Sequence, residues 1–282
     1  MPKAVRRLVA FTGIVSAVLL LSFQTQANPW AQVSGPAKGK ARVIGTYTNG
    51  CVVGAQGLAL TEPGLQAMRP SRKRNFGHPA LLRFMRALGK QALKASWGTV
   101  LVGDLGQARG GPTFANHVSH QSGLDVDVWF RTLKSARVLS DGEREKMAAT
   151  QYVSWKARRL SKKWGAPQTQ MVMFAARHRE VQRVFVSPVI KQELCQTAGA
   201  DRAWLTKIRP WYGHGDHMHV RLLCPSGSPE CAAQAAVPRG DGCGAELSSW
   251  LKPKPASSKP TKPKKRKKRV LPPSCQTLVR NP

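Results

Sequence analysis

The fold is decided by two stretches in which polar and apolar residues alternate, His217-Met218-His219-Val220-Arg221-Leu222 and Leu124-Asp125-Val126-Asp127-Val128. A period of two is typical of a β-strand whose two faces lie in different surroundings. The first stretch therefore places its polar side chains on one face, and the second does the same with its two aspartates. We expect both to be strands whose apolar faces join the core.

Histidines gather near both stretches. Five of the seven fall into two clusters, at residues 117–120 and 214–219. A catalytic zinc ion takes three ligands from the His, Asp and Glu set and keeps a fourth position for water. His120, Asp127 and the pair at 217 and 219 can build such a site. The helical HExxH motif is absent from the sequence, so we expect strands and loops to carry the metal. The alternative is a set of surface or core histidines without a ligand.

Two longer stretches carry a resemblance to a known family. They are Asn116-His117-Val118-Ser119-His120-Gln121-Ser122-Gly123-Leu124-Asp125-Val126-Asp127 and Arg209-Pro210-Trp211-Tyr212-Gly213-His214-Gly215-Asp216-His217-Met218-His219-Val220-Arg221-Leu222. With matching segments at 49–54, 76–79, 98–104 and 240–247, the chain resembles the penicillin-insensitive murein endopeptidases over most of its length. That family is part of a metallopeptidase group that includes lysostaphin, D-Ala-D-Ala peptidases and the hedgehog signalling domain.

The resemblance implies a zinc peptidase that cuts the D-alanyl-diaminopimelate cross-bridge of murein and is insensitive to β-lactams. On the family's motifs, His120, Asp127 and His219 are the ligands of one Zn²⁺. His217 would be the general base or would stabilise the tetrahedral intermediate, with His214 as its partner in proton transfer.

His117 is a further metal candidate, because it could orient His120 or bind a second metal ion. Some members of the family carry a downstream Asp and His that could join it. This chain has no histidine between His120 and His178, so a complete second site is not expected.

The amino terminus predicts a secretory signal peptide over residues 1–27. A charged start with Lys3 and Arg6 precedes an uncharged, mostly apolar run at 8–23, and Thr25-Gln26-Ala27 offers a small-residue cleavage site. An uncleaved anchor is the alternative, but 16 apolar residues are short for a span of roughly 20. We therefore expect a periplasmic protein that does not span the membrane once cleaved.

Six cysteines suit that compartment, since an even number in an exported chain predicts three disulfides. The residues alone leave the pairing open, apart from noting that Cys224 and Cys231 can close a small loop. The resemblance implies the pairs Cys51–Cys275, Cys195–Cys243 and Cys224–Cys231. The bridge to the tail is expected to contribute least, because the tail has few apolar residues to pack.

A net charge of +31 is the most unusual property of the composition. Ten basic and no acidic residues lie between Lys252 and Arg269, in a segment also rich in Pro and Ser. We therefore divide the chain into the signal, a zinc peptidase domain at 28–250 and a basic tail at 251–282. The signal peptide argues against a nuclear or nucleic-acid function, and a basic surface suits an anionic polymer such as peptidoglycan.

Helices and strands alternate irregularly along the domain, which predicts an α+β fold in which a small antiparallel sheet carries the zinc site and helices flank it. We expect helices at 79–97, within 164–179, at 189–198, and at 201–207 with Asp201 as the N-cap. Strands are expected at 99–104 and 181–186. The glycine-rich loop at 106–111 lacks a phosphate-binding pattern.

Several residues keep two interpretations. Asp125 either faces the metal beside Asp127 or supports the site from behind. Trp211 and Tyr212 either line a cleft or lie in the core, and Arg221 pairs either with a substrate carboxylate or in a surface salt bridge. His78 and His178 are expected to be structural.

Three functions remain distinguishable at this stage. The main one is a murein endopeptidase whose partners are cross-linked stem peptides, and the KTG motif that accompanies the SxxK serine of acylated enzymes is absent from the sequence. A carboxypeptidase on the same scaffold would release free D-Ala, and a binding protein would keep the ligands without activity. The sequence does not determine the oligomeric state, for which a dimer is kept open.

Overall fold

The computed structural model describes residues 28–113, 118–134, 137–252 and 270–280. The predicted signal peptide, His117 and the basic run at 264–269 lie outside these described residues. The helices are α1 (Pro29–Gln32), α2 (Pro79–Lys94), α3 (Asp141–Lys146), α4 (Ala166–Arg177), α5 (Pro188–Thr197), α6 (Ala245–Leu251) and α7 (Pro273–Arg280), with 3-10 helices η1 (Pro70–Arg72) and η2 (Ala203–Lys207).

A seven-stranded sheet forms the centre of the molecule, in the order β12-β11-β13-β8-β7-β5-β4. Its strands are β4 (Thr61–Glu62), β5 (Leu65–Ala67), β7 (Thr99–Val102), β8 (Asp125–Leu133), β11 (Val181–Val186), β12 (Ile208–Pro210) and β13 (His217–Leu222). The two predicted site strands, β8 and β13, are antiparallel neighbours, and parallel pairing is confined to β11–β12 and β5–β7. The α+β class is confirmed.

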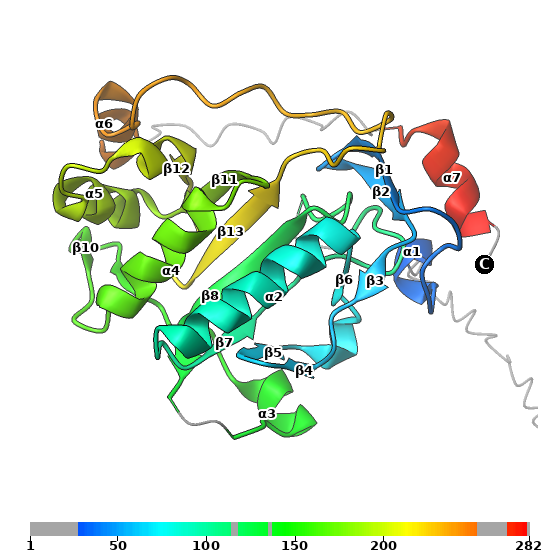
Figure 1. The fold of residues 1–282 in the computed structure, drawn as a ribbon, viewed down its shortest axis with the longest axis horizontal. Coiled ribbons are helices and arrows are strands. Elements are labelled where there is room, and N and C mark those ends of the chain that lie inside the picture. Colours follow the sequence, from blue (N-terminus) through cyan, green and yellow to red (C-terminus); the bar gives the residue numbers. More distant parts are fainter. Residues whose placement is uncertain (1–27, 114–117, 135–136, 253–269, 281–282) are drawn as a thin grey trace, which may run out of the picture.

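Three two-stranded ribbons surround this sheet. They are β1 (Arg42–Thr46) with β2 (Asn49–Val53), β3 (Gln56–Gly57) with β6 (Phe76–Gly77), and β9 (Val153–Ser154) with β10 (Arg159–Leu160). Figure 1 shows β1 and β2 at one end of the molecule and β10, α5 and α6 at the other.

The helices α2 and α4 cover one face of the central sheet (Figure 1). The apolar residues of the alternating stretches point to this face, and Val126, Met218 and Val220 are fully buried in a core with Leu81 and Met171. The polar residues of the same strands lie on the opposite face of the sheet. The alternation in the sequence thus places the core on one face and the candidate site residues on the other.

Most of the predicted elements are present with small shifts at their ends. Helix α2 stops at Lys94 instead of 97, because Gly98 adopts φ +90° and turns the chain into β7. The helix predicted at 201–207 is wrong in type: residues 203–207 form the 3-10 helix η2, without a side-chain cap. Asp201 forms an ion pair with Arg177 instead.

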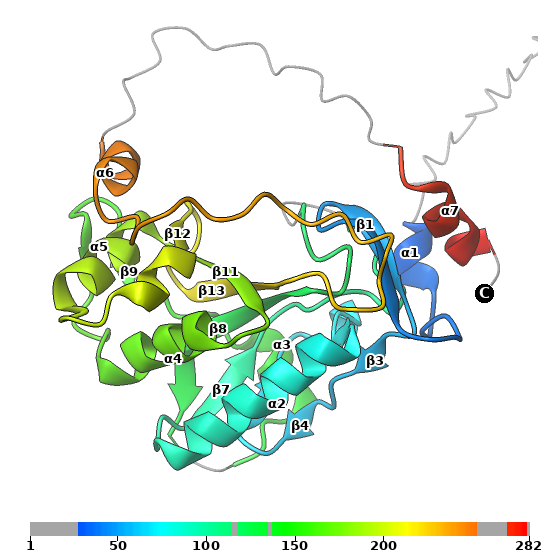
Figure 2. The same ribbon diagram turned by 45° about the horizontal axis from the view of Figure 1, so that its top comes forward.

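Disulfides join the six cysteines in the three pairs that the resemblance implies, Cys51–Cys275, Cys195–Cys243 and Cys224–Cys231. The first ties α7 to β2, where a second small core also contains Trp30 and Ile44. Leu278 packs against this core, so the end of the tail contributes more apolar contact than its composition predicts. Figure 2 shows α1 and α7 beside β1.

Between β13 and α6 the chain runs as an extended segment, residues 223–244, along one side of the molecule (Figure 2). Backbone hydrogen bonds join it to strand β1 through Gly45, whose N–H donates to Glu230 O and whose carbonyl accepts from Ala232 N. Among the residues described, none of the helices has the length and apolar character needed to cross a membrane.

Candidate metal centre and active site

The pairing of β8 with β13 brings the predicted ligands together. In this antiparallel register His219 lies directly opposite Asp127, and Arg221 lies opposite Asp125. His120 enters from the loop before β8 in the left-handed conformation, with φ +68°. A residue other than glycine in this conformation stores backbone strain, which is typical of functional sites.

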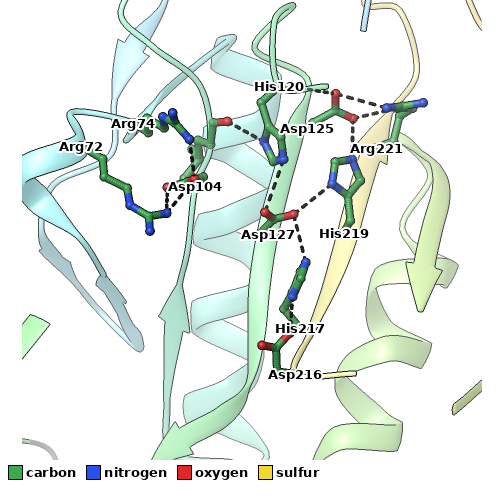
Figure 3. Close-up of polar contacts among 11 residues, drawn as sticks. Arg72, Arg74, Asp104, His120, Asp125, Asp127, Asp216, His217, His219 and Arg221 are labelled. Carbon is green, nitrogen blue, oxygen red and sulfur yellow. Dashed lines mark hydrogen bonds and ion pairs between the residues drawn. The ribbon is translucent and has the colours of Figure 1, made fainter. Parts of the chain in front are cut away.

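Three side chains converge to form a compact, buried group. His219 Nδ1 lies 2.9 Å from Asp127 Oδ1, and His120 Nε2 lies 3.4 Å from Asp127 Oδ2. One ligand atom from each of the three residues falls within 4.8 Å of the others. Figure 3 shows the carboxylate of Asp127 with His120, His217 and His219 around it. Of the predicted metal residues, His117 is outside the described part of the chain.

In each of the two candidate ligand histidines, the other ring nitrogen lies beside a hydrogen-bond acceptor. His120 Nδ1 lies 2.6 Å from the carbonyl oxygen of Leu105, and His219 Nε2 lies 3.0 Å from Asp125 Oδ1. Because a carbonyl or carboxylate oxygen can only accept, these nitrogens carry the protons in the neutral rings. The lone pairs of His120 Nε2 and His219 Nδ1 are then directed toward Asp127. The three side chains could hold a metal ion between them, and two imidazoles with one carboxylate are a donor set that Zn²⁺ takes in proteins.

Asp125 supports the site from behind, in contact with Arg221. Arg221 Nε donates to Asp125 Oδ1 at 2.7 Å, and the backbone N–H of His120 donates to Asp125 Oδ2 at 3.1 Å. Burial alone would raise the pKa of Asp125, but the charge of Arg221 and contact with His219 hold it below its usual range. The carboxylate therefore stays ionised and fixes the His219 ring.

Both predicted roles of Arg221 are wrong. Its guanidinium is buried, lies over the rings of Tyr47 and Phe185 at 4.2 and 5.3 Å, and already pairs with Asp125. It is therefore neither at the surface nor available for a substrate carboxylate. Its charge offsets that of Asp125, which lets an aspartate stay buried behind the metal ligands.

Two histidines without a ligand position stand beside the cluster. His217 Nε2 lies 3.7 Å from Asp127 Oδ1, while its Nδ1 lies 2.6 Å from Asp216 Oδ1. The ring of His214 lies 4.8 Å from that of His217, and its Nδ1 donates to Tyr212 O at 3.0 Å. The sequence analysis named Asp216 only as part of the stretch at 209–222 and assigned it no role. The structure makes it the partner that orients His217.

The pKa values of these two histidines are pushed apart. Burial, and next the charges of His217 and His219, lower the pKa of His214 to about 3. Burial also acts to lower the pKa of His217, but Asp127 and Asp216 outweigh it and raise that pKa. Neighbouring titratable groups with separated pKa values are typical of acid–base sites.

A cationic pair that sequence reasoning missed lies on the other side of His120. Arg72 Nη1 and Arg74 Nη1 donate to Asp104 Oδ2 at 3.1 and 2.9 Å, and Asp104 O accepts from Asp127 N at 2.9 Å (Figure 3). The sequence analysis contained Asp104 only within the motif at 98–104. Its arginine partners lie about thirty residues away, and no local pattern links them to it.

The remaining candidates divide clearly. Trp211 and Tyr212 are 53% and 38% exposed, so they lie at the surface beside His214 and not in the core. His78 caps α2 by accepting from Ala80 N, and His178 packs edge-on against Phe84. The structural expectation for these two histidines is confirmed.

Comparison with known proteins gives one consistent result. The model of the family described as penicillin-insensitive murein endopeptidase matches residues 43–280. Relatives of that name in Klebsiella pneumoniae, Yersinia enterocolitica and Escherichia coli O157:H7 are 46%, 45% and 44% identical to this chain. The alignments cover 93%, 94% and 93% of this chain and 95% of each relative. The chain therefore belongs to the penicillin-insensitive murein endopeptidases.

Proposed function

We propose that this peptidase is zinc-dependent and hydrolyses the D-alanyl-diaminopimelate cross-bridge of peptidoglycan, with His120, Asp127 and His219 as the metal ligands. The observation that carries the proposal is the convergence of two imidazole lone pairs on one carboxylate, each ring fixed through its other nitrogen. When bound there, zinc would supply Lewis-acid activation of a water molecule and of the scissile carbonyl.

His217 is the proposed proton acceptor, through Nε2 on the side of Asp127. Asp216 holds the ring at Nδ1 and stabilises the imidazolium that forms, as an aspartate does in other acid–base pairs. The pKa of His217 is raised mainly by Asp127, so neutralisation of Asp127 by a ligated cation frees His217 to accept a proton. His217 would then return this proton to the leaving amine, and His214, neutral with its Nδ1–H donated to Tyr212 O, is its proposed partner as a hydrogen-bond acceptor.

The domain limits and the location belong to the same proposal. Peptidoglycan lies outside the cytoplasmic membrane, so a peptidase of this family acts there. This supports residues 1–27 as a secretory signal, a catalytic domain at 28–250 in the periplasm, and a basic tail at 251–282 that attracts the enzyme to an anionic polymer.

Chromatography of digested murein tests the activity. We expect cross-linked muropeptide dimers to become monomers, and a chelator to abolish the conversion. Release of free D-Ala without loss of dimers would instead indicate a carboxypeptidase. No release of either product by metal-loaded protein would indicate a protein that only binds murein.

Single variants separate ligands from proton-transfer groups. His120→Ala, Asp127→Ala and His219→Ala should lose both bound zinc and activity. His217→Ala should keep about one zinc per chain and lose at least ~10²-fold in kcat, the usual size of a general acid–base contribution. Elemental analysis of the purified variants decides the roles, because loss of zinc in His217→Ala would make that residue a ligand.

A further inference from the structure

A recess is lined by residues of α5 and α6 and by Tyr212, two residues before His214. Figures 1 and 2 show these two helices at one end of the molecule. The volume of the recess is about 290 Å³, close to the lower end of the roughly 300–1,000 Å³ usual for small-ligand sites. Three aromatic residues, Trp155, Tyr212 and Trp250, line it together with Val189 and Arg158. We refer to it as the aromatic pocket.

The aromatic pocket adjoins the proton-transfer histidines. Tyr212 accepts a hydrogen bond from His214 Nδ1 through its carbonyl, and Ser187, which precedes α5, donates its N–H to His214 O. A second connection runs through ring contacts from His219 to Phe185 at 5.5 Å, from Phe185 to Trp211 at 5.9 Å, and from Trp211 to Trp250 in the pocket at 5.6 Å. A ligand in the pocket would therefore be bound next to the reaction.

The walls are held in place before any ligand arrives. Tyr212 Oη donates to Trp250 O at 2.7 Å, and Arg158 Nη1 donates to Leu251 O at 3.0 Å. Both bonds fasten α6 to the opposite wall. The Tyr212 ring lies 4.9 Å from Trp250 and 6.0 Å from Trp155. A preformed pocket loses little conformational freedom when it binds.

These aromatic rings are unusually exposed for their size. Trp155 and Tyr212 are 41% and 38% exposed, and Trp211 beside them is also at the surface. Single exposed apolar residues are normal, but a cluster of them around a hollow marks an interaction site. A ligand that covers these rings would remove their apolar area from water, which contributes favourable free energy to binding.

The chemistry of murein limits what can fill the aromatic pocket. Its stem peptides present methyl groups, amides, carboxylates, an amine and the short methylene chain of diaminopimelate, none of which has the flat face of a ring. Its sugar rings do present flat faces of C–H groups, which carry partial positive charge and suit the negative face of an aromatic ring. We propose that the aromatic pocket binds an N-acetylated sugar ring of the glycan strand while the attached stem peptide reaches the metal centre. This inference rests on the proposed function.

Direct binding tests the pocket without catalysis. Metal-stripped protein is titrated with chitotriose, an oligosaccharide of N-acetylglucosamine, by calorimetry. Trp155→Ala should weaken binding roughly tenfold, the scale expected for loss of a stacked aromatic ring, and Trp155→Phe should restore most of it. Leu93→Ala, which removes an exposed apolar side chain from α2, is the matched control and should bind as the parent protein does.

Kinetics then separate sugar from peptide recognition. Two cross-linked substrates are compared, a muropeptide dimer with its disaccharides and the same dimer after the sugars are removed. Trp155→Ala should lower the ratio of kcat/KM for the sugar-bearing dimer to that for the sugar-free dimer about tenfold. Most of the loss should appear in KM, because the pocket binds a remote part of the substrate.

Three results would overturn the inference: no binding of chitotriose by the parent protein, equal binding by Trp155→Ala, or equal loss on both dimers. Equal loss would mean that the pocket binds the peptide. Failure of the proposed function looks different, since an inactive protein that still binds chitotriose through Trp155 would retain the sugar site.

Discussion

Asp125 and Asp127 are two residues apart on one strand face, and their partners give them different tasks. Asp127 lies among His120, His217 and His219 with its carboxylate toward the candidate metal position. The charge of Asp125 is balanced by Arg221, and its carboxylate also accepts a hydrogen bond from His219, which orients that ring. The same residue type is thus the proposed ligand in one place and the support of a ring in the other, because a guanidinium accompanies only one of them.

Asp125→Asn should therefore weaken metal binding without removing a ligand. The amide loses the charge that fixes His219 Nε2, and loss of such a support costs about 10–100-fold in metal affinity. Asp216→Asn is the matched variant, because it removes the partner of His217 and should lower kcat with zinc affinity unchanged. Competition with a chelating dye measures the affinity, and circular dichroism checks that each variant is folded. Equal zinc affinity in both variants would contradict these roles.

A buried lysine away from the site gives stability a predicted dependence on pH. Lys191 Nζ donates to Leu205 O at 2.8 Å, and burial, followed by the charge of Arg209, lowers its pKa from 10.5 to about 8. Between these values the unfolded chain still holds the proton that the folded protein has released. Stability then rises with pH through this window, because the unfolded state binds more protons.

Lys191→Met removes this rise. The difference in free energy of unfolding between the parent protein and Lys191→Met should shift in favour of the parent from pH 8 to pH 10. Denaturant unfolding at several pH values measures it, and Lys94→Met, at the end of α2, should leave the slope unchanged. A difference that stays constant across this range would refute the assignment.

Helix α2 shows how an element can be constrained by its neighbour more than by its own propensity. Gly89 lies in its interior, where alanine normally stabilises a helix by up to about 1 kcal/mol. A Cβ at Gly89 would lie 2.5 Å from Pro63 O and 2.8 Å from Leu65 Cγ, however. The glycine allows the helix to approach the β4–β5 turn closely.

Gly89→Ala should therefore destabilise the protein, in contrast to the usual effect. Overpacking of this kind costs typically about 1–3 kcal/mol. Gly142 in α3 is the matched control, since nothing lies within 4 Å of a Cβ there, and Gly142→Ala should be neutral or stabilising by up to about 1 kcal/mol. Thermal unfolding compares the two variants, and stabilisation by both would show that α2 can move away from the turn.

The helices and strands are predicted well from the sequence where the hydrophobic periodicity is strong. The alternation at 124–128 and 217–222 correctly predicts strands with the site on one face, and the strand at 181–186 has its predicted bounds. The helix at 201–207 fails because Asp201 pairs with Arg177 instead of capping it. The contacts of Asp104 with Arg72 and Arg74 join the segments that follow the parallel neighbours β5 and β7, and no local pattern encodes them.

The whole molecule is held by long-range covalent links as well as by its core. Cys51 and Cys275 are 224 residues apart, whereas Cys224 and Cys231 are 7 apart. In the chain-entropy account, a bridge that closes a longer loop restricts the unfolded state more. The expectation that this bridge contributes least rested on a tail with few apolar residues to pack. Leu278, however, packs against the small core at the bridge.

Replacing both Cys51 and Cys275 by Ala should cost more stability than replacing both Cys224 and Cys231. We expect a loss of roughly 2–5 kcal/mol for the first pair and a smaller loss for the second. Denaturant unfolding of the oxidised proteins measures both. An equal or smaller loss for the first pair would mean that α7 is held by packing alone.

The three disulfides are nested one inside another: the pair 224–231 lies within 195–243, which lies within 51–275. A chain that leaves the cytoplasm amino end first presents Cys51 and Cys195 to the oxidant before any correct partner of either has emerged. Pairing in order of arrival would join the wrong cysteines, while the native set closes from the innermost loop outward. With the proposed export, maturation would therefore require either that the first thiols stay reduced until their partners emerge or that early, incorrect bridges are exchanged. Its yield in a cell should then follow the capacity for disulfide isomerisation more closely than the capacity for oxidation.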